Sequence, residues 1–171
     1  VSVKNDCKEL LLLIDFEFVD PPLIRCVNLE THQPDFSFSV DEERSANSSY
    51  DSYGRFIYEP NASILKAGAF NKIAEAFSLK KLSENTHLYT SDQEIKIFPG
   101  RVYEVKEEAK KGSIKEYGEG GKINVVTRNY PLSAQELKKK WKLQDGGKYF
   151  LLAFRDLKGR PQMVISTRTD L

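Results

Sequence analysis

Cysteine, histidine, methionine and tryptophan are scarce in this sequence: its 171 residues include two, two, one and one of them, respectively. Cys7 and Cys26 have no second Cys or His close by in the sequence, so we expect two small buried thiols and no disulfide framework. Such a chain suits a reducing cytoplasm. His32 and His87 lie far apart and outside any His/Cys/carboxylate cluster, so we expect no metal site and no catalytic triad.

Long apolar runs and a strong net charge are also missing. No run approaches the roughly 20 residues that a membrane-spanning helix needs, and no signal-peptide pattern is visible, so we expect no membrane association. The net charge of +1 gives no bulk attraction to nucleic acid. The charge is unevenly spread, however: residues 1–60 carry 5 Lys/Arg and 12 Asp/Glu, whereas residues 101–142 carry 11 and 6. The C-terminal part is therefore suited to an anionic partner.

The sequence begins with Val1, and its single methionine is Met163. We therefore expect a fragment or processed product of a longer protein, whose missing N-terminal part holds the chemistry. Within the chain, residues 10–14 are continuously apolar, which is typical of a strand buried on both faces, although the pattern also fits a short buried helix. Residues 41–53 are acidic and then rich in Ser and Asn, which indicates an exposed linker. The expected parts are terminal strands of an upstream domain (1–45), a linker (46–54) and a small domain (55–171).

The clearest helical pattern covers residues 58–77. Pro60 suits a first turn because its missing N–H costs nothing there, and Asn61 or Ser63 could cap the free backbone donors. Gly68 costs about 1 kcal/mol relative to Ala inside a helix, which we interpret as a sign of close packing against another backbone. Apolar residues recur at steps of three or four and predict one continuous helix with a core-facing stripe: Ala62, Leu65, Ala69, Ile73 and Phe77.

From Arg101 onward the expected order of elements is strand, helix, strand, helix, strand, strand. Ser133-Ala134-Gln135-Glu136 is a capping box, because the Ser133 hydroxyl can accept from the Glu136 backbone N–H while the Glu136 side chain reaches back. It predicts a helix over residues 134–141. The whole order predicts an α/β (α+β) fold, with a mixed β-sheet and a few packed helices.

Motifs that would carry catalysis are weak. Asp20-Pro21-Pro22-Leu23 resembles the Asp/Asn-Pro-Pro-aromatic loop of amino-methylating enzymes, but Leu23 offers no aromatic ring to stack on a base. We interpret it as a connection between strands. The stretch at residues 118–121 follows a helix instead of a strand, so it indicates a turn and not a phosphate-binding loop. We expect no catalytic, cofactor-binding or metal-binding residue in these 171 residues.

Basic residues beside an aromatic residue form the candidate site. Four lysines and a tryptophan within residues 138–142 could contact phosphates and stack on a base or ribose. The alternative is a solvated helix face with Trp141 packed in the core. An aromatic surface that includes Tyr50 and Tyr53 could instead dock onto a partner domain. The candidate RNA-binding residues are Lys110, Lys111, Lys115, Arg128, Lys138, Lys139, Lys140, Trp141 and Lys142.

Four ordered stretches resemble the THUMP-like domain that ends a bacterial family of candidate class I S-adenosylmethionine-dependent methyltransferases. Tyr58-Glu59-Pro60-Asn61, followed by Ile64 and Lys66-Ala67-Gly68, is similar to a YEP(D/N)xxxI(R/K)AG segment of that family. The other three stretches are residues 1–10, residues 88–92 (Leu-Tyr-Thr-Ser-Asp) and residues 128–132 (Arg-Asn-Tyr-Pro-Leu).

The resemblance implies a THUMP-like fold preceded by the last strands of a methyltransferase domain in cis, with S-adenosylmethionine and the catalytic residues upstream of Val1. Domains of the THUMP kind are associated with structured RNA, usually tRNA. We therefore hypothesise a non-catalytic C-terminal part of an S-adenosylmethionine-dependent RNA methyltransferase, which binds and presents tRNA or rRNA. The alternative is a structural module that docks on the methyltransferase domain without contacting RNA.

Overall fold

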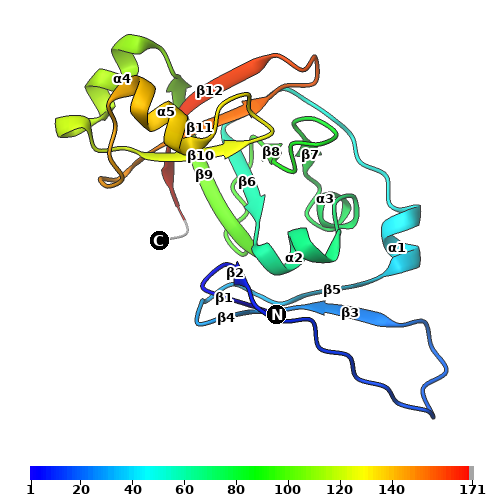
Figure 1. Cartoon of the computed structure of the whole chain (residues 1–171). Coiled ribbons are helices and arrows are strands. Elements are labelled where there is room, and N and C mark those ends of the chain that lie inside the picture. The colour runs from blue at the N-terminus through cyan, green and yellow to red at the C-terminus, as the bar shows by residue number, and fades with distance from the viewer. Residues whose placement is uncertain (170–171) are drawn as a thin grey trace. The chain divides into compact units, whose positions relative to one another are not determined.

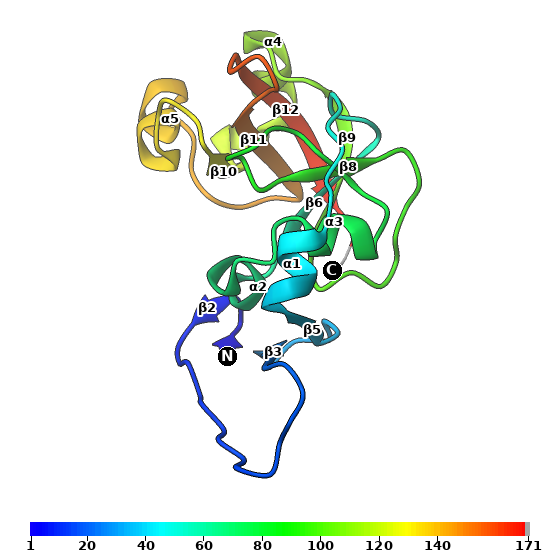
Figure 2. The ribbon, with the colours of Figure 1, turned by 90° about the vertical axis from the view of Figure 1, so that its right-hand side faces the viewer.

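The computed structural model describes residues 1–169, without the side chain of Glu119. These residues form two compact units whose segments alternate along the chain (Figure 1, Figure 2). The expected domain boundaries, around residues 45 and 55, remain a prediction. Unit 1 comprises Val1–Ser48, Pro60–Leu79 and Ile95–Gly100, and unit 2 comprises Ser49–Glu59, Lys80–Glu94 and the described chain from Arg101 onward.

Unit 1 contains short strands and short helices. The strands are β1 (Ser2–Val3), β2 (Asp6–Cys7), β3 (Leu23–Cys26), β4 (Asn28–Leu29) and β5 (Phe36–Ser39), and the helices are α1 (Val40–Ser45), α2 (Ala62–Ala67) and α3 (Lys72–Ala76). β1 pairs antiparallel with β2 and parallel with β4, while β3 pairs antiparallel with β5. Lys4 and Asn5 join β1 to β2 with φ angles of 49° and 66°, a left-handed turn conformation that Asn tolerates well.

Amide side chains hold the start of α2. Asn61 caps the helix, since its Oδ1 accepts from the Ile64 N–H at 3.2 Å, and it also donates to Oε1 of Gln33 at 3.2 Å. Asn28 donates to the same Gln33 oxygen at 2.8 Å, and Gln33 donates to the Gly100 carbonyl at 2.9 Å. The hydrogen bonds of Asn61 offset the desolvation of its buried polar side chain.

The expected single helix over residues 58–77 is wrong. Phe56–Pro60 forms strand β6, and the helical pattern that follows is divided into α2 and α3. Of the two expected caps, Asn61 is the one used. Gly68 ends α2 in the left-handed region with φ = 82°, and a Cβ at this position would meet nothing within 4 Å. The left-handed backbone conformation therefore favours the glycine, and the close packing expected from the sequence is absent there.

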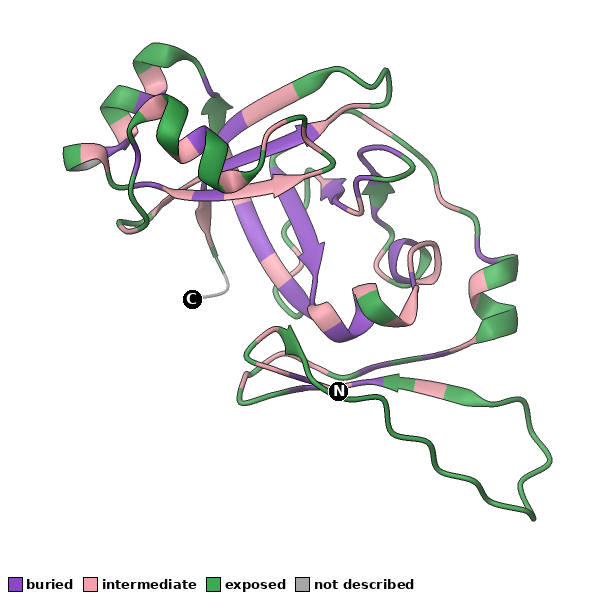
Figure 3. Ribbon diagram, in the orientation of Figure 1, coloured by how far each residue is buried: buried purple, intermediate pink, exposed green. Residues whose placement is uncertain are grey.

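The apolar run Leu10–Ile14 is neither a buried strand nor a helix. It lies in an extended loop between β2 and β3, and its five side chains are 69–96% exposed (Figure 3). Phe16, Phe18 and Val19 of the same loop are also exposed, and we name Leu10–Val19 the apolar loop. The expectation failed because a strand apolar on both faces needs cover on both faces, which residues 1–169 do not provide.

Two smaller expectations also fail. Residues 41–53 are not all linker, because α1 begins after a capping box between Ser39 and Glu42. In addition, Cys26 is buried as expected, but Cys7 is exposed.

Unit 2 is built on one mixed sheet. Its strands are β6 (Phe56–Pro60), β7 (Lys80–Lys81), β8 (Tyr89–Ser91), β9 (Gly100–Glu108), β10 (Asn124–Arg128), β11 (Tyr149–Arg155) and β12 (Pro161–Arg168), and its helices are α4 (Lys111–Tyr117) and α5 (Ala134–Trp141). Among the described residues the strand order is β10-β11-β12-β9-β6-β8-β7, with β10 and β11 parallel and β11 and β12 antiparallel. The mixed sheet and the order β9-α4-β10-α5-β11-β12 confirm the expected fold class.

Alternate residues of β11 face two different cores. Leu151 and Ala153 pack with Ile114 of α4 and Leu137 of α5, whereas Leu152 packs in the cluster on the other face. Both helices therefore cover the same face of the sheet (Figure 1). This alternation is the period of two that a strand imposes on its side chains.

The predicted capping box starts α5. The Ser133 hydroxyl accepts from the Glu136 N–H at 3.2 Å, and the Glu136 carboxylate accepts from the Ser133 N–H at 2.7 Å. The helix ends at Trp141, as predicted, and Lys142 follows with φ = 55°. In residues 1–169, every helix is too short or too polar to cross a membrane.

Candidate functional site

Eight of the nine candidate RNA-binding residues lie on α4 and α5 or directly beside these helices. Lys110 precedes α4, and Lys142 follows α5. The other six lie within the two helices. We name this set the α4–α5 basic surface: Lys110, Lys111, Lys115, Lys138, Lys139, Lys140, Trp141 and Lys142.

A pocket of about 250 Å³ lies between the two helices. Lys111, Lys115 and Trp141 line it, and Ile114 and Leu143 supply apolar surface. Trp141 is half-buried, and its indole Nε1 is enclosed with no hydrogen-bond partner in the described part of the chain. An unpaired donor of this kind is costly unless a ligand or a water completes it. The pocket thus combines two cations with an aromatic residue.

The remaining lysines of the surface differ in their contacts. Lys138 forms an ion pair with Asp145, whereas Lys139 and Lys142 are exposed. The Lys140 Nζ lies 5.9 Å from the centre of the Trp141 ring, within the range of a cation–π contact. The last turn of a helix favours cations in any protein, because the helix dipole is negative there. The exposed lysines at the end of α5 therefore partly fit the alternative given above, in which they form an ordinary solvated helix face.

Arg128, the ninth candidate, has a buried partner elsewhere in unit 2. Its Nη2 forms an ion pair with Oε1 of Glu59 in β6, and its Nη1 donates to the Thr127 carbonyl at 2.8 Å. Nη1 of Arg101 lies 3.4 Å from the other carboxylate oxygen, Oε2. The Tyr103 hydroxyl donates to that same oxygen at 3.2 Å. We name Glu59, Arg101, Tyr103 and Arg128 the Glu59 cluster.

Within the Glu59 cluster, the pKa of Tyr103 is set mainly by burial. Burial raises the pKa of the Tyr103 hydroxyl far above its usual range, and the neighbouring Glu59 carboxylate raises this pKa further, while Arg101 and Arg168 act in the opposite direction. Tyr103 therefore stays a hydrogen-bond donor at all ordinary pH values. Sequence analysis did not assign this cluster, because the pattern predicts a helix over residues 58–77 and does not indicate that Glu59 lies in a buried strand.

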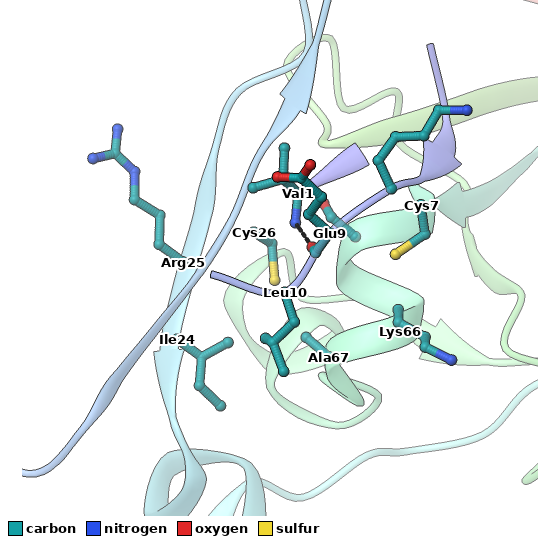
Figure 4. A pocket seen from close by; sticks show the side chains of 11 residues that line it. Val1, Cys7, Glu9, Leu10, Ile24, Arg25, Cys26, Lys66 and Ala67 are labelled. Carbon is teal, nitrogen blue, oxygen red and sulfur yellow. Dashed lines mark hydrogen bonds between the residues drawn. The ribbon is translucent and has the colours of Figure 1, made fainter. Parts of the chain in front are cut away.

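A second cavity, of about 430 Å³, lies in unit 1. Cys26 and Ile24 of β3, Leu10 of the apolar loop and Ala67 of α2 give it a mostly apolar lining (Figure 4). At its edge the Val1 ammonium donates to the Glu9 carbonyl at 2.8 Å. Burial raises the pKa of the Cys26 thiol to about 11, so this sulfur is a poor nucleophile at neutral pH.

The other sequence candidates are placed as follows. Asp20, Pro21 and Pro22 are exposed in the connection between β2 and β3. Tyr53 packs edge-on against Phe154, and Tyr50 is 42% exposed. Within residues 1–169, no group of three or more His, Cys, Asp or Glu side chains is placed to hold a metal ion.

Two segments of the chain match the sequence models of known families. Residues 56–99 match a ferredoxin-like domain, and residues 100–168 match the THUMP domain-like family. The second segment contains α4, α5 and the whole α4–α5 basic surface. The expected resemblance to a THUMP-like domain is thereby confirmed.

The chain is also similar to a solved structure. This is the crystal structure of a candidate methyltransferase from Porphyromonas gingivalis W83, with a TM-score of 0.86 and 30% sequence identity, over 98% of the present chain. The chain spans 44% of the length of that protein. A search of curated proteins finds no match.

Proposed function

We propose that this chain is the part of an S-adenosylmethionine-dependent RNA methyltransferase that binds tRNA or rRNA and presents it to a catalytic domain. The pocket between α4 and α5 carries the proposal, because Lys111 and Lys115 lie there beside Trp141, in the segment that matches the THUMP-like family. The similarity to a candidate methyltransferase supports the enzymatic context. S-adenosylmethionine and the catalytic residues would belong to another domain of the parent protein.

The chemistry of the α4–α5 basic surface suits an RNA segment with an accessible base. Lysines neutralise phosphates and release counterions, which provides affinity without sequence preference. The Trp141 ring offers a stacking face for a base or a ribose. The choice of RNA would therefore depend on its shape more than on its base sequence.

The test measures fluorescence anisotropy of labelled tRNA and rRNA fragments with the 171-residue chain at two salt concentrations. We expect binding that weakens as salt rises, and about a tenfold loss in the double variant Lys111→Gln/Lys115→Gln, with a salt slope lower by about one unit for each lost phosphate contact. The matched control Lys96→Gln/Lys158→Gln removes the same charge from exposed positions elsewhere. Equal loss in both double variants, or no binding at low salt, would contradict the proposal.

The apolar loop favours a second candidate function, docking onto another domain. Leu10 to Ile14, Phe16 and Val19 are each at least 69% exposed, and Leu10 also lines the apolar cavity of unit 1. Contiguous exposed apolar surface of this kind usually marks a protein interface. A strand that is apolar on both faces suits a sheet covered by helices on both sides, which a methyltransferase domain of the parent protein would provide.

Hydrogen exchange can tell whether the apolar loop docks onto another domain or remains exposed to solvent. We expect the backbone amides of residues 10–19 to exchange quickly in the 171-residue chain and to be strongly protected in the full-length parent protein. Equal exchange in both proteins would exclude docking through this loop. RNA binding at α4 and α5 is measured separately, so either function can fail without the other.

A further inference from the structure

Arg101 and Arg128 converge on one buried carboxylate, away from the residues used in the proposed RNA surface. The Glu59 side chain is 1% exposed, whereas the side chains of Arg101 and Arg128 are 31% and 36% exposed. The three residues come from three strands of unit 2: β6, β9 and β10. A ligand that approaches from solvent would therefore meet two guanidinium groups, with the carboxylate beneath them.

The Glu59 cluster has more positive charge and more donors than its own acceptors use. Two guanidinium groups share a single carboxylate, which leaves an excess of one positive charge. Together the guanidinium groups offer roughly ten N–H donors. The described acceptors are the two Glu59 oxygens, one of which also accepts from Tyr103, and the Thr127 carbonyl. The surplus of donors and of charge suits an anion.

We infer that Arg101 and Arg128 form a phosphate-binding site that Glu59 orients. Arginine presents its donors as a planar fork that matches two oxygens of a phosphate, and the tetrahedral phosphate can offer oxygens to both forks. The buried carboxylate restrains the two guanidinium groups before a ligand arrives, which lowers the entropy cost of binding. The Tyr103 hydroxyl supports Glu59 from the core side.

The site also joins two of the stretches that resemble the THUMP-like domain. Glu59 lies in Tyr58-Glu59-Pro60-Asn61, and Arg128 begins Arg128-Asn129-Tyr130-Pro131. The two stretches are far apart in the sequence, but their charged residues form one ion pair. A purely structural ion pair would need one arginine, whereas the cluster contains two.

The test titrates the 171-residue chain, labelled with ¹⁵N at arginine, with inorganic phosphate, adenosine 5′-monophosphate and a short single-stranded RNA. We expect saturable shifts of the Arg101 and Arg128 Nε–Hε NMR signals. Arg101→Gln should weaken phosphate binding about tenfold. Arg101→Lys keeps the charge but loses the planar pair of N–H donors, so its phosphate affinity should lie between those of the wild type and Arg101→Gln. Lys139→Gln removes one charge from the α4–α5 basic surface and should bind phosphate as the wild type does.

Each ligand distinguishes one source of the phosphate group. Equal affinity for inorganic phosphate and the mononucleotide would indicate a site for a free phosphate group, and tighter binding of the RNA would indicate a backbone phosphate. The inference is overturned if none of the three ligands gives saturable shifts, or if a folded Arg101→Gln chain binds phosphate as tightly as the wild type. Failure of RNA binding at α4 and α5 leaves these expectations unchanged, because inorganic phosphate is the probe.

Discussion

Arg128 at the end of β10 forms an ion pair with Glu59 of β6, although three strands separate β10 from β6 in the sheet. Four strand spacings of a flat sheet would place these two strands about 19 Å apart. The two long side chains span part of this distance, and the twist of the sheet brings the strands close enough for the ion pair to form. Glu59 thus connects strands that are distant both in the sequence and in the sheet order.

Removing the Glu59 carboxylate should destabilise the protein. Glu59→Ala leaves Arg101 and Arg128 facing a cavity without their counter-charge, and we expect a loss of about 3 kcal/mol in the free energy of unfolding. Urea unfolding followed by circular dichroism measures it. Glu75→Ala, which removes a surface ion pair with Lys72, should cost less than about 1 kcal/mol. Equal effects of the two variants would show that the Glu59 cluster has no special role in stability.

Removing the cap of α5 should have a smaller, local effect. Ser133→Ala deletes the hydroxyl that accepts from the Glu136 N–H, and we expect a loss of about 1 kcal/mol. Gln135→Ala changes an exposed residue of the same helix and serves as the control, with an expected change close to zero. An unchanged unfolding midpoint in Ser133→Ala would mean that water replaces the cap at no cost.

Trp141 should report RNA binding directly. It is the single tryptophan of the sequence, so intrinsic tryptophan fluorescence comes from the α4–α5 pocket alone. Stacking of a base on the indole should change the emission, and Trp141→Leu should weaken RNA binding by about 1–3 kcal/mol if one base stacks there. An emission spectrum that stays constant while anisotropy shows binding would place the RNA elsewhere.

The two thiols should differ strongly in reactivity. Cys7 is exposed and Cys26 is buried, and burial raises the Cys26 pKa to about 11. A thiol reagent at pH 8 should therefore modify one cysteine quickly in the native chain and both after denaturation. Cys7→Ser should remove the fast phase. Rapid modification of two thiols in the native state would show that unit 1 opens at the cavity beside Cys26.

The raised pKa of Cys26 also predicts that the protein becomes less stable at alkaline pH. The pKa of Cys26 is raised from 9.0 to about 11 by burial, so above pH 9 the unfolded state loses a proton that the folded state keeps. Stability from this group is complete below pH 9 and is lost as pH rises from 9 to 11. Unfolding midpoints across this range should fall less steeply in Cys26→Ala than in the wild type.

Local patterns predicted several elements correctly. The capping box at Ser133 predicted α5, because its hydrogen bonds join residues three positions apart. The alternation of Leu151 and Leu152 follows from strand geometry alone. By contrast, the periodic stripe over residues 58–77 predicted one helix where the chain forms β6, α2 and α3. Periodicity could not show that Gly68 adopts a left-handed conformation, or that Phe56–Pro60 pairs within a sheet.

The sequence by itself determined the class of fold, the resemblance to a THUMP-like domain and the residues of the α4–α5 basic surface, since each depends on short stretches of neighbouring residues. Only the tertiary structure decided that Lys111, Lys115 and Trp141 share one pocket and that the apolar loop is exposed in this chain. It also decided that Arg128 belongs with Glu59. These relationships depend on strand pairing and packing between distant segments, whose free energy is set by the whole fold and not by any local pattern.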